Sequence, residues 1–132
     1  SLTGGMDGSR LTDGPGSSRA FVGSVVAYDG DVKRSLLGVP DGPVVGEAAV
    51  TAMAANVCGV LGADVSVAVT GVAGPGPQEG EEPGTVWMAT CVDGVVEVVR
   101  TRWPFDRTRI RQFTVITVLD ALRLRLLARR DA

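Results

Sequence analysis

Few residues of this 132-residue sequence can do chemistry near neutral pH, and one lysine stands out among them. Lys33 is the only lysine against twelve arginines, and it follows the only tyrosine, Tyr28, by five positions. A lysine whose pKa is lowered by burial can accept a proton, whereas arginine keeps its charge because its pKa is about 12 or above. Lys33 is therefore a candidate general base. An ordinary surface lysine on a short helix is the alternative.

The residue types that are missing narrow the choice of mechanism. The sequence contains no histidine, which excludes Ser-His-Asp and Cys-His catalysis and any histidine-ligated zinc site within it. Cys58 and Cys91 lack the spacing of metal-binding pairs, so we interpret them as reduced core thiols. We expect no metal and no cofactor. A serine deprotonated by an uncharged lysine is a mechanism that this composition allows.

A hydroxyl stands at the beginning of the sequence, in Ser1-Leu2-Thr3-Gly4-Gly5, just where we predict a helix over about 3–12. Backbone N–H groups at a helix start are unpaired, and they can hold the oxyanion of an acyl-transfer intermediate. A serine N-cap followed by a tight glycine turn is the alternative, and on the local pattern alone it is the more frequent arrangement.

A glycine-rich segment, Thr70-Gly71-Val72-Ala73-Gly74-Pro75-Gly76, follows the strand that looks most central in the sequence. Ligands of α/β sheets bind beyond the carboxyl ends of strands, and glycines there let the backbone approach a phosphate or sugar. No Gly-Lys-Ser/Thr follows the segment and no helix does, so it is neither a P-loop nor a dinucleotide fingerprint. A flexible crossover is the alternative.

Three arginines, Arg107, Arg109 and Arg111, begin the last predicted helix, where cations are unfavourable unless an anion compensates them. A bound phosphate would supply that anion, and the fork of a guanidinium fits it. A solvated charged face is the alternative, and Asp106 is expected to cap the helix.

The elements that must position these residues are typical of an α/β fold. We predict strands over 20–28, 65–70, 85–92 and 95–103, the last two joined at Asp93-Gly94 by a type I′ turn. Further helices are predicted over 31–37, 47–61 and 107–129. This order predicts one domain over 1–132, a three-layer-like α/β sandwich with a mixed sheet, a β-hairpin and a long C-terminal helix.

Composition limits the partners. The net charge is −2 and 45% of the residues are hydrophobic, so the chain can bury a core and has no field that attracts nucleic acid or a membrane. No apolar run spans a bilayer and no signal segment opens the sequence, so we expect a cytoplasmic protein. The last helix has two apolar faces, which indicates a homo-oligomer, with deep burial as the alternative. The two faces carry Ile110, Phe113, Val118 and Ala121, and Val115, Leu119, Leu122 and Leu126.

Seven motifs occur in one order along the sequence. They are Ser-x-Thr-Gly-Gly, Leu-Thr-Asp-x-Pro-Gly-Ser-Ser, Val-x-x-Tyr-x-x-x-x-Lys, Leu-Leu-Gly-Val, Thr-Gly-x-Ala-Gly-Pro, Gly-Thr-Val-Trp and Pro-x-Asp-Arg. In this order and with these gaps, the sequence resembles the CinA C-terminal domain family from Ser1 to the last helix.

The resemblance implies a nicotinamide-nucleotide amidase, which converts nicotinamide mononucleotide (NMN) and water into nicotinate mononucleotide and ammonia. It implies that Ser1 is the nucleophile, that Lys33 is its general base, and that Tyr28 belongs to the same hydrogen-bond network. The implied substrate-binding residues are Thr3, Gly4, Thr70, Gly71, Ala73, Gly74 and Arg107, with Arg107 on the phosphate.

The sequence also departs from the family pattern. The resemblance implies a strand and a helix ahead of the serine, and these are missing from the printed sequence. Tyr-Asp-Gly-Asp-Val-Lys replaces the usual Tyr-Ser-Asn-Glu-Ala-Lys, and Pro43-Val44-Val45-Gly46 replaces a Gly-Ala-Val-Ser-like helix start. These departures leave a non-catalytic nucleotide-binding or assembly domain of the same fold as an alternative to the amidase. The two apolar faces of the last helix leave a structural oligomerisation module as a further alternative.

Overall fold

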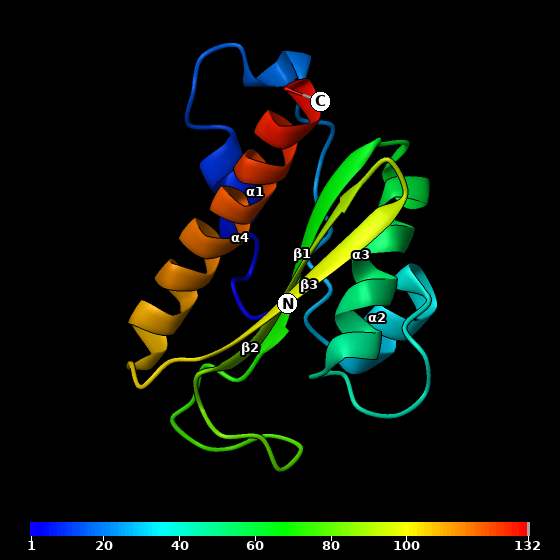
Figure 1. Cartoon of the computed structure of the whole chain (residues 1–132). Helices are drawn as coiled ribbons and strands as arrows, with labels where there is room; N and C mark the ends of the chain where they lie inside the picture. The colour runs from blue at the N-terminus through cyan, green and yellow to red at the C-terminus, as the bar shows by residue number, and fades with distance from the viewer. Residues whose placement is uncertain (132) are drawn as a thin grey trace.

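A three-stranded antiparallel sheet lies between two helical layers in the computed structural model, which describes residues 1–131 (Figure 1). One layer holds α2 and α3, and the other holds α1 and α4 (Figure 1). The α/β sandwich, its hairpin and its long C-terminal helix are thereby confirmed. The elements in chain order are α1 (Met6–Leu11), η1 (Ser17–Arg19), α2 (Gly30–Leu37), α3 (Glu47–Leu61), β1 (Val65–Gly71), β2 (Thr85–Val92), β3 (Val95–Arg102) and α4 (Arg107–Arg130).

The sheet has the order β1-β2-β3, and its central strand differs from the prediction. β2 is buried along nearly its whole length, whereas β1 stands at an edge. The prediction that the strand over 65–70 is central in the sheet is therefore wrong within the described residues. The turn between β2 and β3 is as predicted, because Asp93 (φ 52°) and Gly94 (φ 79°) both adopt the left-handed backbone of a type I′ turn.

The strand predicted over 20–28 is also absent. Exposure alternates along this segment as in a strand, from half-buried Phe21 and Val25 to Val22 and Val26, which are 60% and 52% exposed. No backbone–backbone hydrogen bond joins residues 22–27 to any other residue from 1 to 131. The β-rich composition thus gives an extended path, and a strand does not form because no partner strand reaches it.

Helix ends follow their local signals, and α2 shows how they place a functional residue. The side chain of Asp29 caps α2 by accepting the N–H of Asp31 at 2.8 Å, and Gly38 ends the helix with φ 64°. This start puts Lys33 on the buried face of α2. By contrast, the helix predicted over 3–12 is shortened to α1 because Gly4 (φ 62°) and Gly5 (φ 96°) hold a left-handed turn before it.

α4 packs on the sheet through one stripe only. Ile110, Val115 and Val118 are buried, whereas Phe113 and Ile116 are 42% and 60% exposed. Phe113 was grouped with Ile110 on one predicted face, and this is wrong because the two point to different surroundings. The Asp106 side chain accepts the N–H of Arg109 at 2.9 Å, which confirms the predicted cap. No helix within residues 1–131 has the length and apolarity needed to cross a membrane.

Candidate functional site

A cavity of about 330 Å³ opens beside the C-terminal end of β1 and collects most of the residues singled out in the sequence. Its walls come from the first two residues, the end of the 20–28 segment, α2, the segment before α3, the loop after β1, and the start of α4. Eight of the ten predicted site residues line it: Ser1, Tyr28, Lys33, Thr70, Gly71, Ala73, Gly74 and Arg107.

Lys33 is the most unusual residue of this cavity. The residue is only 2% exposed, and no carboxylate within residues 1–131 lies at ion-pair distance from it. Its Nζ donates one hydrogen bond, to the backbone carbonyl of Tyr28 at 2.7 Å. Burial lowers the pKa of Lys33, and the carboxylates of Asp29 and Glu79 partly oppose that effect. Lys33 therefore has the surroundings of an amine that can lose its proton.

Ser1 lies at the same cavity on a strained turn. Leu2, the next residue, is buried and has φ 57°, a left-handed value that costs a non-glycine residue about 1–3 kcal/mol. Ser1 and Lys33 are therefore two walls of one cavity.

Arg111 holds this turn in place, and the sequence interpretation missed that role. Its guanidinium donates to the carbonyls of Leu2 and Thr3, both at 3.2 Å. The available signal was the spacing of Arg107 and Arg111, because residues four apart share one face of a helix. Thr3 and Gly4 do not line the cavity: Thr3 is 2% exposed and hydrogen-bonds to Asp7, and Gly4 is exposed.

Arg107 joins the loop after β1 to Tyr28 at the cavity rim. One of its nitrogens donates to the Gly74 carbonyl at 2.8 Å, and the other donates to the Tyr28 hydroxyl at 3.3 Å. The exposed Tyr28 side chain thus contacts Arg107, while only its backbone carbonyl contacts Lys33. The guanidinium remains accessible at the cavity, as binding of an anion requires.

Close packing against β2 decides which residue can stand at the end of β1. Gly71 is required because a Cβ there would lie 2.7 Å from the Thr85 carbonyl oxygen and 2.9 Å from Val86 Cα, so its small size serves the close approach of β2. The Thr70 hydroxyl donates to the Val44 carbonyl at 2.7 Å. Thr70 therefore fixes the segment before α3, and nothing in the sequence connects that segment with the site.

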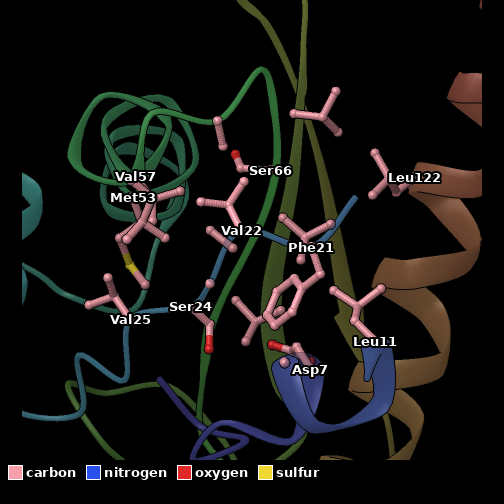
Figure 2. Close-up of a pocket in the computed structure, with 18 of the residues that line it drawn as sticks. Asp7, Leu11, Phe21, Val22, Ser24, Val25, Met53, Val57, Ser66 and Leu122 are labelled. Atoms are coloured by element: carbon pink, nitrogen blue, oxygen red, sulfur yellow. The ribbon is translucent and has the colours of Figure 1, made fainter. Parts of the chain in front are cut away.

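A second, larger cavity of about 540 Å³ runs as an apolar groove between the 20–26 segment, β1, α3 and α4. Figure 2 shows Met53 and Val57 of α3 on one side of it, Leu122 of α4 on the other, and Phe21 and Val22 between them. Asp7 borders the groove, and burial raises its pKa. Its Oδ1 is buried without a hydrogen-bond partner among residues 1–131.

No group of three or more histidine, cysteine, aspartate or glutamate side chains that could hold a metal ion occurs in the described part of the chain. Cys58 and Cys91 are free thiols, the first half-buried and the second buried.

Comparisons with known proteins agree on one family. A model of the CinA C-terminal domain matches residues 1–126. The chain is 47% identical to a CinA-like protein of Frankia casuarinae, over 97% of this chain and 30% of that protein. It is 44% identical to a CinA-like protein of Gemmatimonas aurantiaca, over 93% of this chain and 30% of that protein. The chain thus spans about 30% of the length of these curated relatives.

Solved structures share the fold. The competence damage-inducible protein A of Klebsiella pneumoniae superposes with a TM-score of 0.92 at 31% identity, over 96% of this chain and 83% of that one. A competence/damage inducible protein of Agrobacterium tumefaciens gives 0.87 at 35% identity, over 92% and 79%. From the family match and these likenesses, the chain belongs to the CinA C-terminal domain family.

Proposed function

We propose that the cavity beside β1 is the active site of a nicotinamide-nucleotide amidase that uses Ser1 and Lys33. The observation that carries the proposal is a lysine only 2% exposed, without an ion-pair partner among the described residues, in one cavity with a serine hydroxyl. Burial keeps such an amine uncharged over a wider pH range, which is the form a general base requires. The resemblance supplies the substrate class, NMN.

The proposed reaction has two steps. Lys33 takes the proton of the Ser1 hydroxyl while the Ser1 oxygen attacks the carboxamide carbon of NMN. The carbon–nitrogen bond then breaks, and ammonia leaves with the proton that Lys33 returns, so that an acyl-enzyme remains. In the second step Lys33 deprotonates water, which attacks the ester carbon and releases nicotinate mononucleotide and the serine hydroxyl. No metal and no cofactor take part in this scheme.

The test is ammonia release from NMN by the full-length gene product. Ser1→Ala removes the attacking oxygen and should lower kcat at least about a thousandfold. Ser18→Ala, on exposed η1, is the matched control and should keep wild-type kcat. A Ser1→Ala enzyme that still releases ammonia at more than a tenth of the wild-type rate would remove this mechanism.

Arg107 is proposed to bind the nucleotide phosphate. Arg107→Met should raise KM for NMN about ten- to a hundredfold and leave KM for nicotinamide riboside, which lacks the phosphate, nearly unchanged. Arg107→Lys keeps a positive charge but loses the paired N–H donors of the guanidinium, so its KM for NMN should lie between those of wild type and Arg107→Met. Arg109→Met, on the exposed side of the same helical turn, is the control. Equal losses for both substrates would show that Arg107 only supports the loop through Gly74.

A second candidate function is nucleotide binding without turnover. One observation favours it: the hydrogen bond of Lys33 goes to the Tyr28 carbonyl, and none joins it to the Ser1 hydroxyl. Titration calorimetry with NMN and with nicotinate mononucleotide separates the candidates. Binding of both nucleotides without ammonia release favours the binding domain, and absence of binding removes it.

We also propose that the apolar groove receives the strand that the resemblance places ahead of Ser1. Ser1 and the C-terminal end of β1 line one cavity, so a strand that ends at Ser1 would run parallel to β1. It would lie between the free edge of β1 and the unpaired 20–26 segment, which both line the groove. The solved relatives have residues without a counterpart here, since the chain covers 83% and 79% of them. Such a strand would make the sheet mixed.

Two further expectations stay proposals. A homo-oligomer is proposed through the exposed side chains of Phe113 and Ile116. The Phe113 ring lies tilted against Phe105, with the two ring centroids 5.1 Å apart, and light scattering tests the oligomer. The proposed location is cytoplasmic, because a charged nucleotide does not enter lipid unaided.

A further inference from the structure

The loop between β1 and β2 folds back on itself in a narrow turn. Gln78 and Glu81 exchange backbone hydrogen bonds of 3.1 and 2.8 Å, and the two residues between them, Glu79 (φ 52°) and Gly80 (φ 76°), are left-handed. This is the backbone of a type I′ turn, whose first position normally holds asparagine, aspartate or glycine. A glutamate there contradicts the local preference, which suggests that its side chain has a separate task.

The Glu79 carboxylate reaches back to the segment before α3. One oxygen accepts the N–H groups of Val44 and Val45 at 3.1 and 2.9 Å, and the other accepts the Val44 N–H at 3.1 Å. These bonds join positions 34 and 35 residues apart in the sequence. Hydrogen bonds to an ionised carboxylate are about twice as strong as neutral ones, so this contact fastens the tip of the loop.

The fastened backbone forms part of the candidate site. Val44 and Val45 line the cavity, and the Val44 carbonyl accepts the hydroxyl of Thr70, another wall residue. On the other side of the contact, residues 74–78 of the loop line the same cavity. Glu79 therefore closes a ring of contacts that runs from the end of β1 through Val44 to the loop and back.

We propose that Glu79 is a positioning residue that fastens the loop after β1 over the candidate site and so fixes the width of the nucleotide pocket. The inference rests on the proposed function for its substrate. Glu79 has a second effect through its charge, since it favours the ammonium form of Lys33. The other groups that act on Lys33 are Asp29 with the same sign and Arg34 with the opposite sign.

Three variants of the full-length gene product test the role. Glu79→Ala removes all three hydrogen bonds, so KM for NMN should rise about tenfold or more, with a smaller change in kcat. Amide hydrogen exchange at Val44 and Val45 should become faster by a similar factor. Glu79→Gln keeps an accepting oxygen, so KM should stay within about threefold of wild type. Glu82→Gln, the same change at an exposed position of the loop, is the control.

The pH profile tests the effect of the Glu79 charge on Lys33 separately from the fastening of the loop. Removing the Glu79 charge lowers the pKa of Lys33, so the acid limb of kcat/KM should move to lower pH in Glu79→Gln and stay in place in Glu82→Gln. Unchanged exchange at Val44 and Val45, with unchanged KM, in Glu79→Ala would overturn the inference. If the wild-type protein released no ammonia from NMN, the proposed function would fail, while faster exchange in Glu79→Ala would still support the fastening of the loop.

Discussion

Lys33→Met is expected to lower kcat for ammonia release from NMN at least about a thousandfold while the protein stays folded. Methionine fills a similar volume without an amine, so the proton of the Ser1 hydroxyl loses its acceptor. The measurement is steady-state ammonia release by the full-length gene product. Calorimetry should show that NMN still binds within about tenfold of the wild-type affinity, since the change removes the base and leaves the rest of the cavity in place.

The same variant has a second expected result, in stability. Burial lowers the pKa of Lys33 in the folded protein, so below the unfolded value of 10.5 the unfolded chain binds the proton more tightly. Folding therefore loses stability as the pH falls through this window, and Lys33→Met should unfold at a higher temperature than wild type at neutral pH. Ser35→Met, on the exposed side of α2, is the control with the same incoming side chain. Retained activity in Lys33→Met would show that another group accepts the proton.

Filling the apolar groove with a strand is expected to have the largest effect on stability. Both faces of the groove are covered, by α3 on one side and by α4 on the other, so the matching strand is apolar on both faces. Fusing seven residues of valine, isoleucine and alanine directly before Ser1 should raise the Tm of the 132-residue chain by about 5–15 °C. Amide exchange should slow along 22–27 and along the outer edge of β1.

The matched control carries prolines at two central positions of the same fused segment. Proline lacks the N–H that a ladder requires, so this fusion should keep the Tm of the unextended chain. If both fusions raised the Tm equally, the groove would be a general apolar site and the strand proposal would be wrong. A concentration-dependent Tm with the first fusion would instead show that the segment enters the groove of a second copy.

Much of this fold could be predicted because its signals are local. Asp29 and Gly38 delimit α2, Asp106 begins α4, and Asp93-Gly94 turns the hairpin, each through its own backbone preference. The candidate site could be predicted in outline for the same reason, since Lys33 lies on a helix that follows an extended segment and Thr70-Gly71 ends a strand. These features need no knowledge of which elements become neighbours.

The rest depends on contacts between distant parts of the chain. The 20–28 segment has the composition of a strand, but pairing needs a partner edge, which composition does not reveal. Glu79 was one of three glutamates in a loop without periodicity, and only folding shows that its carboxylate meets Val44. Gly71 was interpreted as room for a ligand, whereas its size is required by the approach of β2.

The two hydrogen bonds from Arg111 to Leu2 and Thr3 join residues 109 and 108 positions apart, nearly the two ends of the sequence. Because Arg111 belongs to α4, the turn that carries Ser1 is held in its described shape only when α4 has docked on the rest of the fold. A shortened chain that lacks α4 would keep the hydroxyl of Ser1 and the amine of Lys33 but lose the guanidinium that holds the turn. Its cavity would then lack both Arg107 and a fixed position for Ser1.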